Sequence, residues 1–502
     1  MIKNRKSIKT NKNIVPKKTG PTNQPTSIHS DLQKNISLFK TLYSYPTNAD
    51  FKVRDIFIPS LQKQAALVYI DTITDTVLLE RGIIHSLSTQ NREDATVQDL
   101  LTTQSISTEM NVEKITTGIN NGSVALFIEE SDHGYILQIP KFEGRQVDKA
   151  ENETTVKGPQ EAFNEIAATN ISLIRKRIKN EHLIAESITV SKRAENKVSI
   201  VYVNNLVNEQ LLEDVRSRIS SIDTDAIHTL SQLEQYIEDR SLTLFPTMLY
   251  TERPDRAAML LEDGHIVLVM DNSPDCLILP ATFWTFFHSP EDSYLRFTSG
   301  NFTRLIRILA LFITLFFSAI YIAITNFHVE MIPPDLLLAI ASTRDKVPLP
   351  AFLELILMEV AFELIREAGL RAPTPIAPMA SIVGALIIGQ SAVQANIISP
   401  IVVIIVALSG LCSFIIGDIS MNIAIRITRF LCIFAAGLFG LFGLTAIVVA
   451  EIAYIVSLKS FGTPYFAPLT PKILPTGTYF RTFLQKDIFR PGYLKTKDIT
   501  KR

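Results

Sequence analysis

Residues 305–325 read LIRILALFITLFFSAIYIAIT, and this stretch decides the class of the protein. Its only charged residue is Arg307, which lies near the start. A helix of about 20 apolar residues crosses the ~30 Å hydrocarbon core of a bilayer, so the stretch predicts a transmembrane helix. The alternative, a buried core helix of a soluble protein, fits a charge-poor stretch of this length less well.

The charged residues are divided unevenly on the two sides of this stretch. The chain of 502 residues carries 49 Lys and Arg against 50 Asp and Glu, and most of them lie in residues 1–300. At about 150 residues per domain, the length allows two to four domains. The net charge of −1 argues against nucleic-acid binding, which needs a basic surface. We therefore expect a polar N-terminal region followed by an α-helical polytopic membrane domain.

No pattern in the chain indicates an enzyme or a metal site. The three cysteines, Cys276, Cys412 and Cys432, form no CxxC pair, so a disulfide framework or a zinc site is not expected. The eight histidines form no HxxxH or HExxH pair, and phosphate-loop and GxSxG motifs are absent. We expect no catalytic residues and no cofactor.

The first 45 residues combine many lysines with several prolines, and no apolar run typical of a signal peptide follows them. We expect residues 1–45 to form a disordered basic tail. The tail would either contact an anionic membrane surface or act only as a solubilising segment.

Strand-like and helix-like segments alternate through the rest of the polar region, which predicts an α/β fold. A Lys/Glu/Thr-rich linker at 143–158 divides it into two α/β subdomains, 46–150 and 151–300. The expected strands outside hairpins are 65–70 and 198–203, and the expected helices are 76–87, 97–103, 160–180 and 207–221.

Two hairpins are also expected in this region. The first joins strands at 123–128 and 135–139, and the second joins 257–261 to 265–270. Just before the second hairpin, the charged run Thr251–Arg256 is either a functional turn or a salt-bridged connection.

Two more apolar regions follow the first membrane helix, at 376–416 and 430–458. The first is too long for a single span, and Gln394–Asn396 together with Ser399-Pro400 divides it into two helices. Residues 301–460 are therefore expected to form a transmembrane domain of four to five helices.

Basic residues set the expected orientation of this domain. Arg304 and Arg307 precede the first helix and the basic tail 461–502 follows the last, so the positive-inside rule places both termini in the cytoplasm. Four crossings satisfy this arrangement, but Arg426 and Arg429 of the expected 417–429 loop would then face outward. A re-entrant pair or a fifth crossing would remove the conflict.

A helix that bears acidic residues is expected at 350–371, with Pro350 at its start. Glu359, Glu363 and Glu367 recur every four residues, so they share one face of the helix. Carboxylates beside membrane spans are costly unless they meet water, a cation or a base, and acidic rings attract ions in cation pores. The stripe is therefore either part of an ion path or is neutralised by Arg366 and Arg371 at the membrane surface.

Small residues cluster in the last apolar region at Gly437, Gly440 and Gly443. Such residues let membrane helices approach one another closely. They would serve either packing within one subunit or an interface between subunits.

Several blocks of this second half resemble the spore germinant receptor A-subunit family, called the GerA family. The blocks are Val347–Phe352, Leu357–Gly369, Ser381–Gln390 and Ser399–Val403, with Glu252–Arg256 and Leu279–Phe283 upstream. The resemblance covers about residues 50 to 470. It adds Gly384, Gly389, Gln390, Asn396 and Pro400 to Arg366 and the three glycines as candidates for packing or gating. The family commonly has glycines near 377 and 396, where this chain has Ala377 and Asn396, with Pro378 beside the first.

The resemblance implies a role in spore germination. Members lie in the inner membrane of bacterial spores and work with a transporter-like B subunit and a lipoprotein C subunit. The resemblance implies that the A subunit forms a homo-oligomer, with a pentamer as the candidate size, that acts as a nutrient-gated cation channel. The alternatives are a non-conducting scaffold that relays a signal, or a stage V sporulation AF-type paralogue linked to dipicolinic-acid release.

Overall fold

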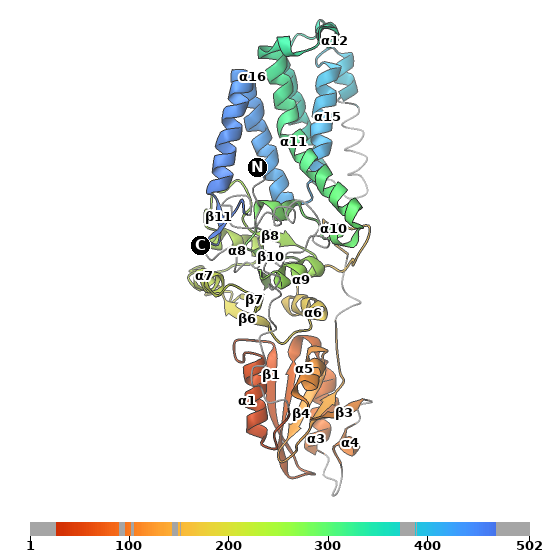
Figure 1. Ribbon diagram of the computed structural model, residues 1–502, viewed down its shortest axis with the longest axis vertical. Coiled ribbons are helices and arrows are strands. Elements are labelled where there is room, and N and C mark those ends of the chain that lie inside the picture. The colour runs from red at the N-terminus through yellow and green to blue at the C-terminus, as the bar shows by residue number, and fades with distance from the viewer. Residues whose placement is uncertain are drawn as a thin grey trace, which may run out of the picture. The chain divides into compact units, whose positions relative to one another are not determined.

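The computed structural model describes residues 27–89, 96–101, 105–142, 149–150, 152–371, 387 and 389–467. They divide into two compact units (Figure 1). The first unit is built from residues up to Asp239 together with Tyr250–Pro280, and it holds two sheets. The second unit is built from Arg240–Leu249 together with residues from Ala281 onward, and it is mainly helical.

The first sheet has five strands in the order β1-β2-β4-β5-β3. Its strands are β1 (Phe51–Ile58), β2 (Lys63–Ile70), β3 (Ile106–Glu109), β4 (Val124–Ile128) and β5 (Gly134–Leu137). Helices α1 (Leu32–Leu42) and α5 (Val112–Asn120) cover one face. The segments α2 (Thr76–Leu78), η2 (Leu79–Ile84), α3 (His85–Thr89) and α4 (Val97–Leu100) cover the other.

Strand β2 shows how both faces of this sheet are filled. Leu67 and Tyr69 belong to the core under η2 and α3, whereas Ala66, Val68 and Ile70 belong to the core under α1 and α5. Successive side chains of a strand point to opposite faces, so an uninterrupted apolar strand is what two covered faces require. The expected hairpin between 123–128 and 135–139 is confirmed by the antiparallel pairing of β4 with β5.

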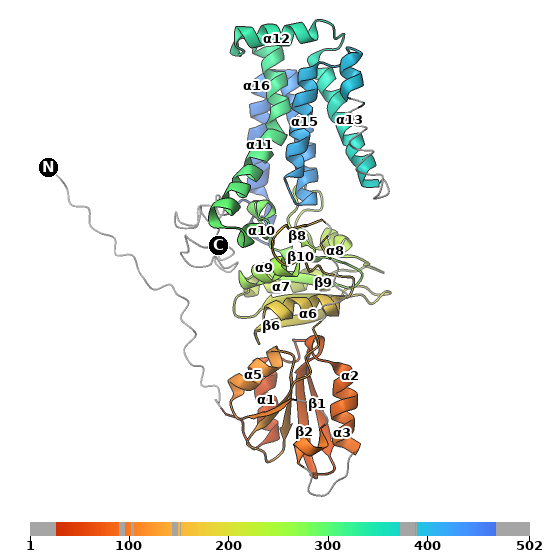
Figure 2. The same cartoon turned by 90° about the vertical axis from the view of Figure 1, so that its right-hand side faces the viewer.

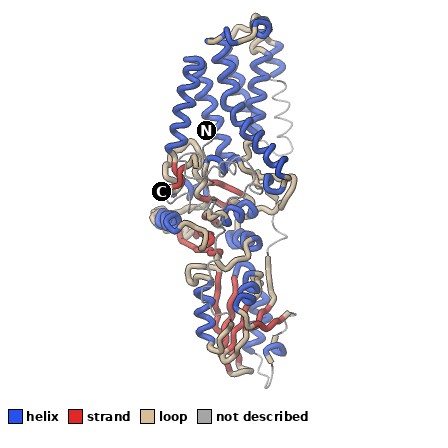
Figure 3. The backbone as a smooth tube through the Cα atoms, viewed as in Figure 1, coloured by secondary structure: helices blue, strands red, loops and turns tan. Residues whose placement is uncertain are grey.

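The second sheet repeats this architecture, and Figure 3 shows the strands of the two sheets as separate groups. Its strands lie in the order β6-β7-β9-β10-β8. Counted along the chain, this is the order 1-2-4-5-3, which is also the order of the first sheet. The strands are β6 (Leu183–Thr189), β7 (Lys197–Val203), β8 (Leu249–Thr251), β9 (Ile266–Met270) and β10 (Cys276–Leu279). The helices are α6 (Ala167–Arg177), α7 (Glu209–Ser220), α8 (Leu230–Ile237) and α9 (Pro254–Glu262).

Matching local structures show that the two halves are versions of one unit. The tetrapeptide Asn-Ile-Ser-Leu occurs at 35–38 in α1 and at 170–173 in α6. Asn35 Oδ1 accepts a hydrogen bond of 2.9 Å from the amide of His29, and Asn170 Oδ1 accepts one of 2.9 Å from the amide of Asn164. Both asparagines therefore fix the chain entering the helix in the same way.

A second pair of equivalent positions follows the fourth strand of each sheet. Glu130 and Asn272 both have left-handed φ angles, 61° and 64°. Their amides donate to the carbonyls of Ser30 and Glu165, at 3.0 Å and 2.8 Å. Each contact ties the strand end to the start of the first helix of its half.

A buried ion pair joins the two halves of the first unit. Arg175 in α6 donates to both carboxylate oxygens of Asp50, at 2.6 Å and 2.8 Å, and both side chains are less than 10% exposed. Next to this pair, the amide of Ala49 donates to the carbonyl of Ala185 at 2.8 Å. An ion pair and a backbone hydrogen bond therefore connect the two sheets, in agreement with their belonging to one compact unit.

Two predictions for the first unit are wrong. Part of the expected disordered tail is helix α1, because Asp31 caps its first turn and Leu32, Ile36 and Phe39 recur at helical spacing on a buried face. The expected strand at 257–261 is helix α9. A short apolar run fits a strand or a helix equally well, and here Pro254 starts a helix.

The second unit is a bundle of long helices. Its helices are α10 (Glu291–Tyr294), α11 (Phe297–Phe327), α12 (Pro334–Arg344), α13 (Ala351–Arg371), α15 (Pro400–Phe414) and α16 (Ile419–Ser457), with the short pair β11 (Lys459–Ser460) and β12 (Thr463–Pro464). Figure 2 shows α12 lying across the ends of the longer helices. By length and composition, α11 and α16 could each cross a membrane. Among the described residues, α13 agrees with the predicted helix at 350–371.

Helix α16 is folded back on itself at Gly440, and Figure 1 shows its two arms as separate blue helices. Gly440 has φ 61° and ψ −143°, a conformation that glycine adopts readily. Cys432 Sγ lies 3.9 Å from Glu451 Oε1, whereas 19 residues of a straight helix would separate these groups by about 28 Å. The 39 residues of α16 are therefore two antiparallel arms.

The prediction of a loop at 417–429 is also wrong, because the first arm of α16 begins at Ile419. Asp418 caps this arm by accepting a hydrogen bond from the amide of Met421 at 2.8 Å. Arg426 and Arg429 therefore lie on a helix within the bundle rather than on an outward-facing loop. The number of membrane crossings stays a prediction, since part of the expected 376–416 region lies outside the described residues.

Candidate functional site

The acidic face of α13 meets two arginines of α16. Glu359 is fully buried, and its Oε1 accepts a hydrogen bond of 2.8 Å from Ser318 of α11. Its Oε2 lies 2.9 Å from Nη2 of Arg429, which is also fully buried. Helices α11, α13 and α16 thus converge on one carboxylate.

The next acid on this face completes the network. Arg429 Nη2 donates to Glu363 Oε1 at 2.7 Å, and Arg426 Nε donates to the same oxygen at 3.0 Å. Arg426 also pairs with Oε2 of Glu363 through its Nη2. Since Glu359 and Glu363 are four residues apart and Arg426 and Arg429 three apart, each pair lies on one side of its helix.

Arg366 of α13 extends the network toward α15. Its Nη2 pairs with the hydroxyl of Ser413, and its guanidinium carbon lies 4.5 Å from the ring centre of Phe414. Its Nη1 is 3.5 Å from Oδ1 of Asn422. Aromatic rings and neutral polar groups, rather than a carboxylate, therefore surround much of this cation.

We call Glu359, Glu363, Arg366, Arg426 and Arg429 the charge network. With all five side chains ionised it carries three positive and two negative charges, so its net charge is +1. The expected neutralisation of the stripe by Arg366 and Arg371 holds only at its exposed end, where Arg371 Nε lies 2.7 Å from Glu367 Oε1. The buried carboxylates are neutralised mainly by α16.

Sequence reasoning missed the partners of this network. Ser318 and Ser409 were not singled out, yet Ser409 contacts both Glu359 (3.4 Å) and Arg429 (3.3 Å). A usable signal was present, because two arginines spaced by three residues beside a long apolar run need buried partners. Matching them to the acids of α13 would have predicted the packing of α13 on α16.

The glycines expected to serve packing or gating lie in close contacts within the chain. A Cβ atom added to Gly437 would lie 2.4 Å from the ring of Phe352, so this glycine makes room for a side chain of α13. Gly440 forms the fold between the arms, and Gly443 follows it closely packed against Ala435. These contacts favour the packing interpretation for all three glycines.

The other candidates have different surroundings. Gly389 has only ordinary contact with Val403, Gln390 is exposed, and Pro400 is the first residue of α15. Asn396 has a left-handed φ of 54°, a conformation in which asparagine is the usual substitute for glycine. This explains how Asn396 replaces the glycine common in the family. Gly384 lies outside the described residues, as do Ala377 and Pro378.

The charged run Thr251–Arg256 binds the segment that connects the two sheets, through buried side chains that contact Glu153 and Pro159. Arg253 is 1% exposed and donates to the carbonyls of Glu153 (3.2 Å) and Pro159 (2.8 Å) while pairing with Asp255 (2.7 Å). Arg256 pairs with the carboxylate of Glu153. The geometry favours the structural alternative, a salt-bridged connection.

The start of α11 is fixed by a similar cluster. Asp292 is fully buried and accepts hydrogen bonds from Arg307 (2.7 and 2.8 Å) and Arg304 (2.9 Å). Burial alone would raise the pKa of Asp292, but the hydrogen bonds and charges of Arg307 and Arg304 hold it below its usual value. The two arginines behind the orientation prediction therefore share one carboxylate.

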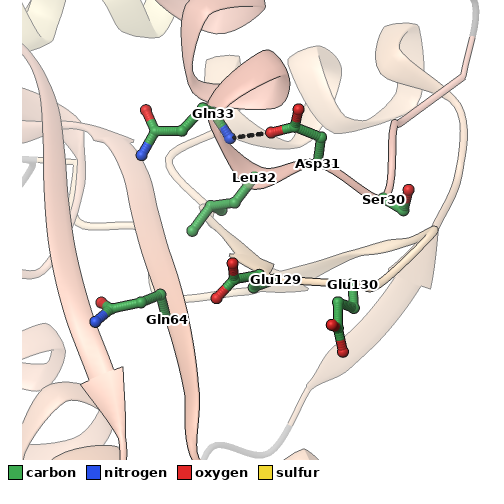
Figure 4. A pocket seen from close by; sticks show the side chains of 7 residues that line it. All are labelled: Ser30, Asp31, Leu32, Gln33, Gln64, Glu129 and Glu130. Carbon is green, nitrogen blue, oxygen red and sulfur yellow. Dashed lines mark hydrogen bonds between the residues drawn. The ribbon is translucent and has the colours of Figure 1, made fainter.

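A shallow cavity of about 450 Å³ lies at the start of α1 (Figure 4). Three carboxylates are among its lining residues, from Asp31, Glu129 and Glu130. Asp31 is already occupied as the cap of α1, and Glu130 lies 3.0 Å from Lys63. The described part of the chain holds no group of three His, Cys, Asp or Glu residues that could bind a metal ion.

Comparison with known proteins gives consistent matches. A model of the family described as Bacillus/Clostridium GerA spore germination protein matches residues 38–493. Spore germination protein KA of Bacillus subtilis (strain 168) is 37% identical over 455 residues, which cover 89% of this chain and 83% of that protein. Spore germination protein A1 of the same organism is 36% identical over 355 residues, covering 71% and 74%.

The chain is also similar to a solved structure. It is the crystal structure of the N-terminal domain of the A subunit of the Bacillus megaterium spore germinant receptor GerK3. The match covers 51% of this chain and 98% of that one, with 24% identity and a TM-score of 0.38.

Proposed function

Because this chain belongs to the GerA family of Bacillus/Clostridium spore germination proteins, we propose that it is the A subunit of a nutrient germinant receptor. In this proposal it lies in the inner membrane of the spore as a multi-pass protein with both termini in the cytoplasm. It works with a transporter-like B subunit and a lipoprotein C subunit. Copies of the chain assemble into a homo-oligomer, for which we propose a pentamer, that conducts cations when nutrient binds.

The charge network is the observation that carries the channel part of the proposal. Ionisable side chains inside a membrane bundle are costly and mark ion paths in many membrane proteins. Here five of them lie together on α13 and α16, of which α16 is long and apolar enough to cross a membrane, and Glu359 and Arg429 are fully buried.

The ion pairs between α13 and α16 suggest how the proposed channel opens. Glu359 and Glu363 are paired with Arg426 and Arg429, so a cation moving along α13 meets a network of net charge +1. In our proposal, nutrient binding separates α13 from the first arm of α16, which exposes the carboxylates to the path. Glu367, at the exposed end of the stripe, would attract cations to its entrance.

A non-conducting scaffold is the second candidate function, and a specific observation favours it. Glu359 and Glu363 are both ion-paired with arginines, and paired charges serve to lock a bundle as well as to conduct. In that case the first unit would relay a signal from the B subunit. A stage V sporulation AF-type role would be distinguished by its gene neighbours, since receptor genes lie beside B- and C-subunit genes.

Current recording separates these functions. The chain would be purified with its B and C subunits, reconstituted in planar bilayers and exposed to nutrient germinants. Nutrient-dependent cation current in the wild type, lost in a Glu359→Gln/Glu363→Gln receptor that still assembles with its B and C subunits in the membrane, supports the channel. A complete receptor that binds nutrient without passing any current would identify the scaffold.

A further inference from the structure

Four buried polar atoms from four different elements share one location in the second unit. They are Oη of Tyr321 in α11, Nε of Arg344 in α12, Oε1 of Glu354 in α13 and Oγ of Ser399, which precedes α15. Within the described part of the chain, none of these atoms has a hydrogen-bond partner. The charge network uses none of these residues.

Contacts between the four residues show that they converge. Glu354 and Ser399 are fully buried, and the amide of Ser399 donates to Glu354 Oε2 at 2.8 Å. Arg344 Nε lies 3.7 Å from Glu354 Oε1, close enough for an ion pair but too far for a hydrogen bond. The hydroxyls of Tyr321 and Ser399 lie close enough to interact but outside the geometry of a regular hydrogen bond, and Tyr321 is within electrostatic range of Arg344 and Glu354.

Buried polar groups are nearly always hydrogen-bonded. The ion pair of Arg344 and Glu354 and the contact of Tyr321 with Ser399 leave four polar atoms at one location without regular hydrogen bonds, which points to a common partner. The partner must accept from the N–H of Arg344 and donate to the carboxylate of Glu354. The hydroxyls of Tyr321 and Ser399 can each donate or accept. The partner therefore needs at least one donor and one acceptor, and up to four hydrogen bonds in total.

The charges at this location exclude several kinds of partner. A metal cation or an ammonium group would be repelled by the guanidinium of Arg344 and could not accept a hydrogen bond from its N–H group. An anion would be repelled by the carboxylate of Glu354. A neutral molecule with two donors and two acceptors matches all four groups, and internal waters commonly make about three such bonds.

We propose that these four residues form a binding site for one internal water molecule. The water accepts from Arg344 Nε and Tyr321 Oη and donates to Glu354 Oε1 and Ser399 Oγ. It joins α12 to α11, α13 and the start of α15, so the connection between α11 and α13 is fixed by hydrogen bonds as well as by apolar contacts. This role does not depend on whether the protein conducts ions.

Radiolytic labelling tests the site in the full-length protein, kept in lipid nanodiscs. X-rays generate hydroxyl radicals from water held beside a side chain, and rapid mixing into ¹⁸O-water distinguishes internal water from bulk water. We expect Tyr321 to be labelled severalfold more than Tyr43 and to retain ¹⁶O after mixing. Tyr43 is the matched control, because it is fully buried and its hydroxyl is satisfied by Asn120 at 3.0 Å.

The variant Ser399→Ala adds a second criterion. Ser399 makes no side-chain cap to α15, so the substitution removes the hydroxyl without removing a helix cap. We expect the ¹⁶O label on Tyr321 to fall severalfold in Ser399→Ala. Labelling of Tyr321 no higher than that of Tyr43, label derived only from bulk ¹⁸O-water, or no change in Ser399→Ala would each overturn the site.

Discussion

Arg429 Nη2 lies 2.9 Å from Glu359 Oε2, and both side chains are fully buried in the helical unit. The residues come from α16 and α13, and no local pattern links them. Removing one member of such a pair leaves an uncompensated buried charge. That cost is larger than the net benefit of forming the pair.

Arg429→Leu should therefore destabilise the helical unit strongly. We expect a loss of about 3–5 kcal/mol in the free energy of unfolding, because Glu359 would remain buried without a cation, and its side-chain hydrogen-bond partners among the described residues would be Ser318 and Ser409. The double variant Glu359→Leu/Arg429→Leu should recover part of the loss. Thermal unfolding of the purified protein in detergent measures both.

The exposed pair of Glu367 and Arg371 is the matched control for this experiment. Its side chains are 54% and 80% exposed, so Arg371→Leu should change stability by less than about 1 kcal/mol. Equal effects of Arg429→Leu and Arg371→Leu would contradict the assigned burial of the charge network.

Gly437 should not tolerate a larger side chain. A Cβ at this position would lie 2.4 Å from the Phe352 ring, so Gly437→Ala overpacks the contact between α13 and α16. We expect a loss of about 1–3 kcal/mol, measured by thermal unfolding.

Two comparisons make this expectation specific. Phe352→Leu should rescue Gly437→Ala at least in part, since it removes the atoms that clash. Gly389→Ala should be nearly neutral, because the added Cβ would lie 3.6 Å from Val403, an ordinary van der Waals contact. If Gly437→Ala is as stable as the wild type, the two helices are not this close.

Asp275 should make the stability of the first unit depend on pH. Burial, followed by the negative charge of Glu252, raises the pKa of Asp275 to about 6, from an ordinary value of 3.8. The folded state thus holds a proton that the unfolded state has released between about pH 4 and pH 6. Stability should fall as the pH rises through this window and then stay level above it.

Asp275→Asn should remove this dependence and stabilise the protein at pH 7. We expect about 1–2 kcal/mol, because water reaching the partly exposed carboxylate screens part of the cost. Unfolding of both proteins between pH 4 and pH 7.5 measures the effect. A variant less stable than the wild type at pH 7 would show that the carboxylate is needed in its charged form.

Periodicity and composition predicted the elements that depend on local sequence. The apolar stretch at 305–325, the helix at 350–371 and the hairpin at 123–139 depend on length, caps and alternation, and the structure contains all three. Helix α9 was mistaken for a strand, since five apolar residues are compatible with both periods. Its true signal was Pro254, a single residue outside the run.

The site itself could be predicted only in part, because its partners are distant in sequence. The acids of α13 were identified from their spacing, but Glu363 and Arg426 are 63 residues apart, and only packing brings them together. The duplication of the first unit was within reach. The repeated Asn-Ile-Ser-Leu at 35–38 and 170–173 is visible in the sequence, yet four residues alone do not distinguish a repeat from chance.

The buried pair of Arg175 and Asp50 should hold the two sheets of the first unit together. Arg175→Leu would leave Asp50 buried with only the hydroxyl of Thr72, 3.0 Å away, as a side-chain partner among the described residues. We expect a loss of about 3–5 kcal/mol in the free energy of unfolding. Hydrogen exchange should locate the loss at the amides of Ala49 and Ala185, which bond across the two halves.

An exposed ion pair provides the control substitution for Arg175→Leu. Lys192 and Asp223 lie 2.6 Å apart but are 70% and 74% exposed, so Lys192→Leu should alter stability by less than about 1 kcal/mol. It should leave the exchange of Ala49 and Ala185 unchanged. Faster exchange throughout both sheets in Arg175→Leu, rather than first at these two amides, would show that the pair supports the whole unit and not the joint between its halves.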